Sequence, residues 1–231
     1  MFRIGLRLIV EGQRRVDTCG NRGIAGNLCA RHTIIGERVG SFYRNVTLLG
    51  TDIDTVREVA PRPAFLTTDD DDVVVFAESD EAGADHSGAR LSAMLDCIAI
   101  SVGIHDDDIF FFDVHDRGDS VISGAVPDLS AYFDVDPEVS AEPHASAGRG
   151  HEPSAVPDAD APPDAITLVG AVGRGDVDAV RAALQGDFLF ATERHEATAI
   201  ALGLPRGAVG WGYRYLSADA TGYTGPALIR I

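Results

Sequence analysis

The sequence predicts an α/β protein with a parallel or mixed sheet, built around a β-α-β unit in its middle region. Two observations support this class. An apolar strand, an apolar-periodic helical segment and a second apolar strand follow one another, and both strands are apolar on both faces instead of alternating. Continuous apolar strands on either side of a helix are typical of parallel pairing through a right-handed crossover.

Charge divides the chain into three regions. Of the 36 acidic side chains, 27 lie in residues 51–164, whereas residues 1–50 are basic and residues 165–231 are balanced. Residues 134–164 are rich in Pro, Ala, Ser and acids, which predicts a disordered acidic linker. We therefore expect an α/β domain with a basic N-terminal segment over 1–133, followed by this linker and a small α+β C-terminal piece over 165–231.

The overall composition indicates a salt-adapted protein. The formal net charge is -17, and all nineteen basic side chains are arginine. Such an acidic, lysine-free composition is of the halophile type, in which carboxylates keep the surface hydrated. No apolar run is long enough to span a membrane, and the N-terminus lacks the pattern of an export signal, so we expect a cytoplasmic protein. The spacing of the three cysteines predicts neither a disulfide framework nor a zinc ribbon.

The basic first region predicts two strands and a glycine-rich loop. Side chains of one parity are apolar over residues 2–10, and a second strand is expected over 41–49. Between them, backbone amides around Gly23 and Gly26, together with Arg22, are candidates for binding a phosphate or carboxylate of a substrate. The alternative is a loop whose arginines pair with acidic side chains of the middle region.

The middle region supplies the predicted β-α-β unit. Residues 73–77 form its first strand, a helix capped by Ser87 runs through Val102, and the second strand begins at Ile109. The HDDD sequence before Ile109 reads as a turn, and residues 121–126 are expected to add one more strand.

Acidic side chains and a histidine follow the two strands of this unit. Glu78 and Asp80 come after the first strand, and Asp113 and His115 lie at the end of the second. Because parallel strands bring their carboxyl ends to one edge, these four are the candidate ligands of Mg²⁺ or Mn²⁺. The sequence thus predicts a divalent-metal-dependent enzyme acting on a phosphorylated or other small anionic substrate. The alternative is a set of solvated carboxylates on a salt-adapted surface.

The last region predicts a strand over 166–169 and helices over 176–185 and 193–202, with Gly203 ending the second helix. A short final strand is expected within the closing GPALIRI sequence.

The stretch HEATAIALGLPRGAVGWGYRYL, residues 195–216, resembles a helix-turn-helix over about twenty residues. This resemblance implies a DNA-binding transcriptional regulator. However, Val209, Trp211, Tyr213 and Tyr215 alternate, which favours a strand and disfavours nucleic acid as a partner. A third hypothesis is a ligand-binding or partner-binding module without catalysis.

Overall fold

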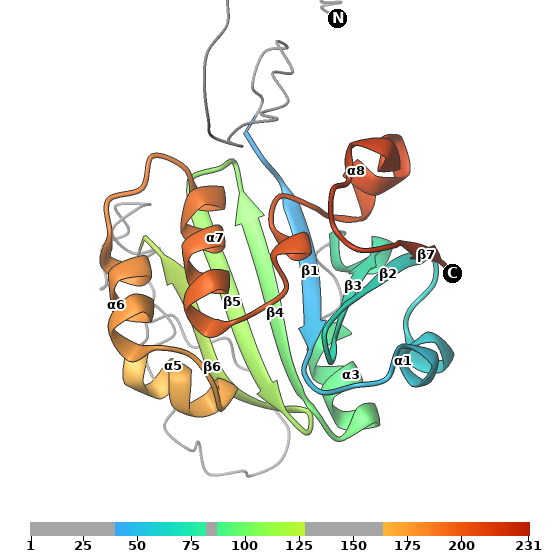
Figure 1. The fold of residues 1–231 in the computed structure, drawn as a ribbon, viewed down its shortest axis with the longest axis horizontal. Coiled ribbons are helices and arrows are strands. Elements are labelled where there is room, and N and C mark those ends of the chain that lie inside the picture. Colours follow the sequence, from blue (N-terminus) through green and yellow to red (C-terminus); the bar gives the residue numbers. More distant parts are fainter. Residues whose placement is uncertain (1–39, 82–86, 128–163) are drawn as a thin grey trace, which may run out of the picture. The chain divides into compact units, whose positions relative to one another are not determined.

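The structure is a computed structural model, and it describes residues 40–81, 87–127 and 164–231. In this part of the chain a seven-stranded sheet has the order β6-β5-β4-β1-β3-β2-β7, and every neighbouring pair is antiparallel (Figure 1). The strands are β1 (Tyr43–Leu48), β2 (Ala64–Asp69), β3 (Asp72–Ala77), β4 (Ile98–His105), β5 (Ile109–Asp116), β6 (Asp119–Val126) and β7 (Ile229–Arg230).

Helices lie between these strands along the chain. They are α1 (Ile53–Val59), α2 (Glu78–Glu81), α3 (Ser87–Leu95), α5 (Ala165–Val172), α6 (Val177–Gln185), α7 (Ala191–Leu202) and α8 (Tyr213–Ala218), with short 3₁₀ turns η1 (Arg206–Ala208) and η2 (Ala220–Gly222). None of the helices in the described residues has the length and apolar character needed to cross a membrane.

Several predictions fall on residues that the structure does not describe. These are the strand over 2–10, the loop with Arg22, Gly23 and Gly26, and nearly all of the linker over 134–164. The division into an α/β domain, a linker and a C-terminal piece therefore stays a prediction.

The elements from β1 to β4 form a split β-α-β arrangement, with the short α2 between β3 and α3. The chain runs β1-α1-β2-β3-α3-β4, and these strands lie side by side in the order β4-β1-β3-β2. This is the ferredoxin-like pattern, in which each pair of helix-linked strands encloses a third strand. β3 and β4 thus run in the same direction, but β1 lies between them and is antiparallel to both.

The predicted parallel or mixed sheet with a central β-α-β unit is therefore wrong. The helix that begins at Ser87 ends at Leu95, and residues predicted as its second half form β4. β5 follows β4 through a tight turn and pairs with it antiparallel, so β5 runs opposite to β3. The error has a physical cause: an antiparallel strand covered on both faces is as apolar as a parallel one, and a short apolar run does not distinguish helix from strand.

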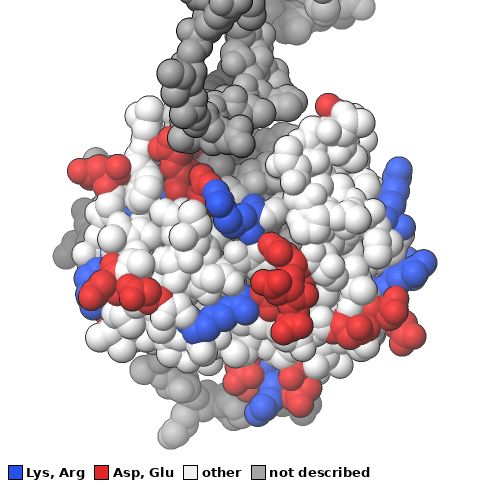
Figure 2. Space-filling view, viewed as in Figure 1, with Lys and Arg blue, Asp and Glu red and all other residues white. Residues whose placement is uncertain are grey.

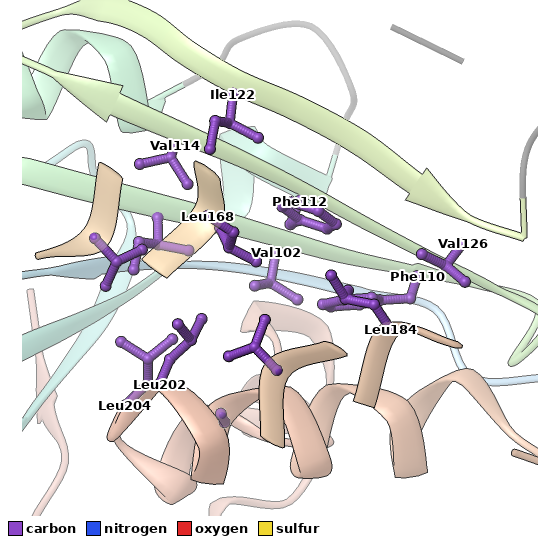
Figure 3. Packing of buried hydrophobic residues seen from close by; sticks show 14 of the residues in the cluster. Val102, Phe110, Phe112, Val114, Ile122, Val126, Leu168, Leu184, Leu202 and Leu204 are labelled. Carbon is purple, nitrogen blue, oxygen red and sulfur yellow. The ribbon is translucent and has the colours of Figure 1, made fainter. Parts of the chain in front are cut away.

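Helices α5, α6 and α7 cover one face of β4, β5 and β6 (Figures 1 and 3). The strand side chains that point toward these helices are Val102, Phe110, Phe112 and Val114, and the helices contribute Leu168, Leu184 and Leu202. Alternate strand residues form a second cluster with side chains of α1 and α3, among them Val46, Val75, Ala99, Val56 and Leu91. The buried apolar area of these two clusters supplies the main stabilisation of the fold.

The turns between β4, β5 and β6 are tight. Asp106 and Asp107 have φ of 53° and 62°, and Arg117 and Gly118 have φ of 52° and 93°. Two successive residues with positive φ are typical of the hairpin turns that match the twist of antiparallel strands. The HDDD sequence is therefore a turn, as its composition indicates.

The C-terminal helices confirm some predictions and correct others. α6 and α7 lie where the sequence predicts helices, and Gly203 ends α7 with φ of 65°. The strand expected over 166–169 is instead the helix α5. The final strand is present as β7, paired with β2.

Residues 206–212 form neither the expected strand nor a recognition helix. The 3₁₀ turn η1 ends at Ala208, and α8 begins only at Tyr213. Gly210 has φ of 80°, and the buried amide of Asn45 donates to the carbonyl oxygens of Ala208 and Trp211, at 2.8 and 3.0 Å. These contacts hold the segment against the sheet as an irregular loop.

Candidate functional site

The four predicted metal ligands lie on two elements that do not share an edge. Glu78 and Asp80 are in α2, directly after β3, whereas Asp113 and His115 are in β5. In the sheet β5 is three strand positions from β3, roughly 14 Å at about 4.8 Å per strand. Because the two strands also run in opposite directions, their carboxyl ends point to opposite ends of the sheet.

Asp80 and His115 nevertheless both approach the start of α3. The Asp80 carboxylate accepts a hydrogen bond from Ser87 Oγ at 2.6 Å, and each of Asp80 and His115 is 5% exposed. The His115 ring lies so close to Gly88 that a Cβ there would be 3.1 Å from His115 Cδ2. These buried polar side chains fix the beginning of α3 on the sheet.

The other two predicted ligands lie apart from this pair. The Asp113 carboxylate accepts a hydrogen bond from Ser123 Oγ of β6 at 2.5 Å, and Glu78 is exposed. In the described ranges, no three His, Cys, Asp or Glu side chains are grouped closely enough to hold a metal ion. The four predicted residues therefore do not form one ligand set.

A pocket of about 260 Å³ lies at the end of the sheet where β1 begins and β4 ends. Its lining comes from three neighbouring strands and from two segments beside them. The strands contribute Arg44, Gly103, His105 and Phe111, Phe42 directly precedes β1, and Glu81 and Arg214 line the side of the pocket.

The register of the sheet explains why this surface is hollow. Arg44, Gly103 and Phe111 are direct partners across β1, β4 and β5 and therefore point to the same face. Gly103 has no side chain, so Arg44 can lie along the sheet. Its Cγ and Nε are both 3.5 Å from the position that a Cβ of Gly103 would take. A glycine between an arginine and a phenylalanine thus forms the floor of the pocket.

The charges in the pocket differ from those of the chain as a whole. Among the described residues, the exposed Arg44 guanidinium forms no ion pair or hydrogen bond. Arg214 lies beside Glu81, whose carboxylate oxygens accept from the Arg214 backbone N–H at 3.0 and 3.1 Å and lie within 3.7 Å of its Nε. Two guanidinium groups thus face one carboxylate in a protein with a net charge of -17.

Burial acts on Glu81, the acidic side chain of this pocket lining. Its side chain is 9% exposed, and burial raises the pKa of its carboxyl group, with hydrogen bonding by Arg214 opposing the shift. Desolvation disfavours the ionised carboxylate. Burial of Glu81 therefore disfavours the negative charge that would repel an anion in this pocket.

A second, wider hollow of about 450 Å³ lies near η1 and is a weaker candidate. It is lined in part by Trp211, Asp69, Glu196 and Arg206. The Arg206 guanidinium donates to Glu196 at 2.6 Å, so its charge is already balanced within the protein. On the face shown in Figure 2, the described basic side chains stand in small groups beside acidic ones.

Sequence reasoning did not identify this pocket. The strand predicted over 41–49 places Phe42 and Arg44 on one face, which was the available signal. Nothing in the chain indicates that β4 and β5 would bring Gly103 and Phe111 beside Arg44, because register between distant strands is not a local property.

Comparison with models of known protein families, with curated proteins and with solved structures gave no match. The description of the site therefore rests on its own geometry.

Proposed function

We propose that this chain binds a small ligand with a phosphate or carboxylate group in the pocket between Arg44 and Arg214. The observation that carries the proposal is the exposed Arg44 guanidinium, which lines that pocket and has no ion-pair partner among the residues that the structure describes. Five other arginines of the described segments pair with carboxylates, as acidic surroundings favour: Arg117, Arg174, Arg181, Arg206 and Arg214. Arg44 keeps its charge available where there is room for a ligand.

The chemistry of the two arginines suits an oxyanion. A guanidinium group is planar, remains charged at any physiological pH, and can donate two parallel hydrogen bonds to a phosphate or carboxylate. Arg44 is held by a central strand of the sheet, and the backbone of Arg214 is held by Glu81. Groups on such supported elements are positioned more precisely than groups on free loops.

The proposal is limited to binding. The metal-assisted reaction expected from the sequence depended on parallel strands that bring four ligands to one edge, and the sheet is antiparallel. The pocket beside Arg44, and not the predicted metal ligands, supports the small anionic ligand that the sequence predicts.

Titration with inorganic phosphate by isothermal calorimetry tests this function. Arg44→Gln should weaken phosphate binding by at least about ten-fold, because a hydrogen bond to a charged group contributes about 1.5–3 kcal/mol. Arg57→Gln is the matched control, since Arg57 is exposed on α1, is not part of the pocket lining, and gives the same change in net charge. Equal weakening in both variants would show a general charge effect and contradict the proposal, as would the absence of binding by the unaltered protein.

A further inference from the structure

We infer that the anion bound in this pocket carries a planar aromatic group, an inference that rests on the proposed function. It names the class of ligand, which the two arginines alone leave open. Three features of the pocket support it: its volume, its aromatic lining, and the glycine between Arg44 and Phe111.

The pocket is too large for an inorganic oxyanion alone. A phosphate ion has five non-hydrogen atoms, whereas the pocket volume is about 260 Å³. At about 30 Å³ per molecule of liquid water, this is room for on the order of nine waters. A ligand that contacts both walls must therefore extend well beyond its charged group.

The space beyond the arginines is lined by aromatic side chains. Phe42 and Phe111 are half-buried and lie on the same face of the sheet. The Phe42 ring is held edge-on against His105, with centroids 4.9 Å apart and an interplanar angle of 87°. Its backbone N–H donates to the Tyr215 hydroxyl at 3.0 Å, which fixes this end of β1. A rigid aromatic wall favours a flat apolar group over a flexible polar one.

Gly103 provides the flat floor on which Arg44 lies beside Phe111. The Arg44 Cγ and Nε are 3.5 Å and the Phe111 Cβ is 3.7 Å from the position that a Cβ of Gly103 would take. An aromatic ring in the pocket would therefore lie over the outward face of the Arg44 guanidinium, with the Phe111 ring beside it. Arginine stacks on aromatic faces through cation–π attraction while its edge donates to an anion. One side chain can thus contact both parts of the ligand.

Three probes distinguish the aromatic inference from the proposed anion binding. They are inorganic phosphate, phenyl phosphate and benzyl alcohol, each titrated into the full-length protein by calorimetry. We expect phenyl phosphate to bind at least about ten-fold more tightly than phosphate, and benzyl alcohol to bind more weakly than either. Equal affinity for phosphate and phenyl phosphate would overturn the aromatic inference but would not contradict anion binding. Benzyl alcohol binding as tightly as phenyl phosphate, or no binding by any probe, would overturn both.

A pair of substitutions at Gly103 locates the aromatic group. A Cβ at this position meets its nearest neighbours at 3.5–3.7 Å, ordinary contact distances, so Gly103→Ala should keep the affinity for phenyl phosphate. Gly103→Val adds methyl groups where Arg44 now lies, so it should lower that affinity more than ten-fold, while valine itself favours a strand. Phe111→Thr, on the opposite wall, should lower affinity for phenyl phosphate but not for phosphate. Unchanged phenyl phosphate binding in both Gly103→Val and Phe111→Thr would overturn the inference.

Discussion

At the scale of single residues, His195 shows how burial sets a protonation state. This side chain of α7 is 3% exposed, its ring stacks on Phe110 at 5.7 Å, and its Nδ1 lies 2.8 Å from the Tyr43 hydroxyl oxygen. Burial lowers the pKa of His195 from 6.5 to about 3. The folded protein thus holds a neutral imidazole over a range in which the unfolded chain would bind a proton.

This difference makes the folded state sensitive to acid. Because the folded pKa of His195 is depressed, its contribution to stability is present above pH 6.5 and is lost as the pH falls from 6.5 toward 3. The loss amounts to at most about 1.4 kcal/mol per pH unit. His195→Gln cannot take up this proton, so the free energy of unfolding in urea should fall less steeply with pH between 6.5 and 4.5 than in the unaltered protein.

His105→Gln, which replaces an exposed histidine, provides the control for the loss of an imidazole as such. Equal slopes for all three proteins would contradict a neutral buried His195. The comparison between variants also removes the shared contribution of the many carboxylates, which titrate in every one of them.

The residue scale is also where sequence reasoning about the site was weakest. The sequence predicts Asp80 and His115 as metal ligands, whereas the structure buries both at the start of α3, where Asp80 accepts from Ser87 Oγ and His115 lies against Gly88. Their polar residue types were informative. The prediction that they converge on one metal ion depended on strand direction, which the local sequence does not encode. Arg44 and Gly103, which form the floor of the pocket, carry no motif.

At the scale of elements, the start of α7 is capped by Asp107, a residue of the turn between β4 and β5. Its N-cap residue, Phe190, has no side chain able to cap. Instead the Asp107 carboxylate accepts hydrogen bonds from the hydroxyl and backbone N–H of Thr192, at 2.6 and 3.4 Å, and the Asp107 carbonyl accepts from Ala191 N–H. The turn between β4 and β5 thus provides acceptors for backbone N–H groups in the first turn of α7, which have no partner within the helix.

Substitutions at Asp107 should separate this capping from the strain of its backbone, whose φ is 62°. Asp107→Asn keeps an acceptor and tolerates this conformation, so its free energy of unfolding should stay close to that of the unaltered protein. Asp107→Gly relieves the backbone but removes the cap, and should lose about 1 kcal/mol. Asp107→Ala should lose more, because it removes the cap and keeps the strain. Equal stability of the Ala and Asn variants in urea unfolding would show that the cap contributes nothing, because Asp107→Ala removes the cap without relieving the strain.

Elements with local end signals were predictable and short apolar runs were not. α6 begins at Asp176, whose carboxylate accepts from Ala179 N–H, and α7 ends at a left-handed glycine, so both boundaries are marked in the sequence. Residues 98–105 have no such marks, and residues 166–169 belong to a helix that ends at the left-handed Gly173 but has Gly170 in its interior. Their apolar side chains suit a buried helix and a buried strand equally, and tertiary packing decided which formed.

At the scale of the whole molecule, the described C-terminal helices and the sheet share one core. Leu168, Leu184 and Leu202 pack on side chains of β4 and β5, and Arg174 pairs with Asp72, which is buried at the start of β3. A helical layer on one face and α1 with α3 on the other bury both faces of the strands. This double coverage is why alternation is missing from the sequence, and why an antiparallel sheet was mistaken for a parallel one.

A shared core predicts that sheet and C-terminal layer unfold together. Trp211 is the single tryptophan of the chain, and it lies in the C-terminal part, where its carbonyl oxygen accepts from Asn45 of β1. Its fluorescence therefore reports the contact between the layers, while hydrogen exchange of β4 and β5 amides reports the sheet. Both should give the same free energy of opening in urea, because separating the layers exposes the cluster that stabilises each of them. Arg174→Gln removes the ion-pair partner of the buried Asp72, which keeps only the hydrogen bond from Gly50 N–H among the contacts described, and should lower both values equally. A fluorescence change at lower urea than the loss of protection in β4 and β5 would instead mean that the C-terminal helices detach from a sheet that is stable without them.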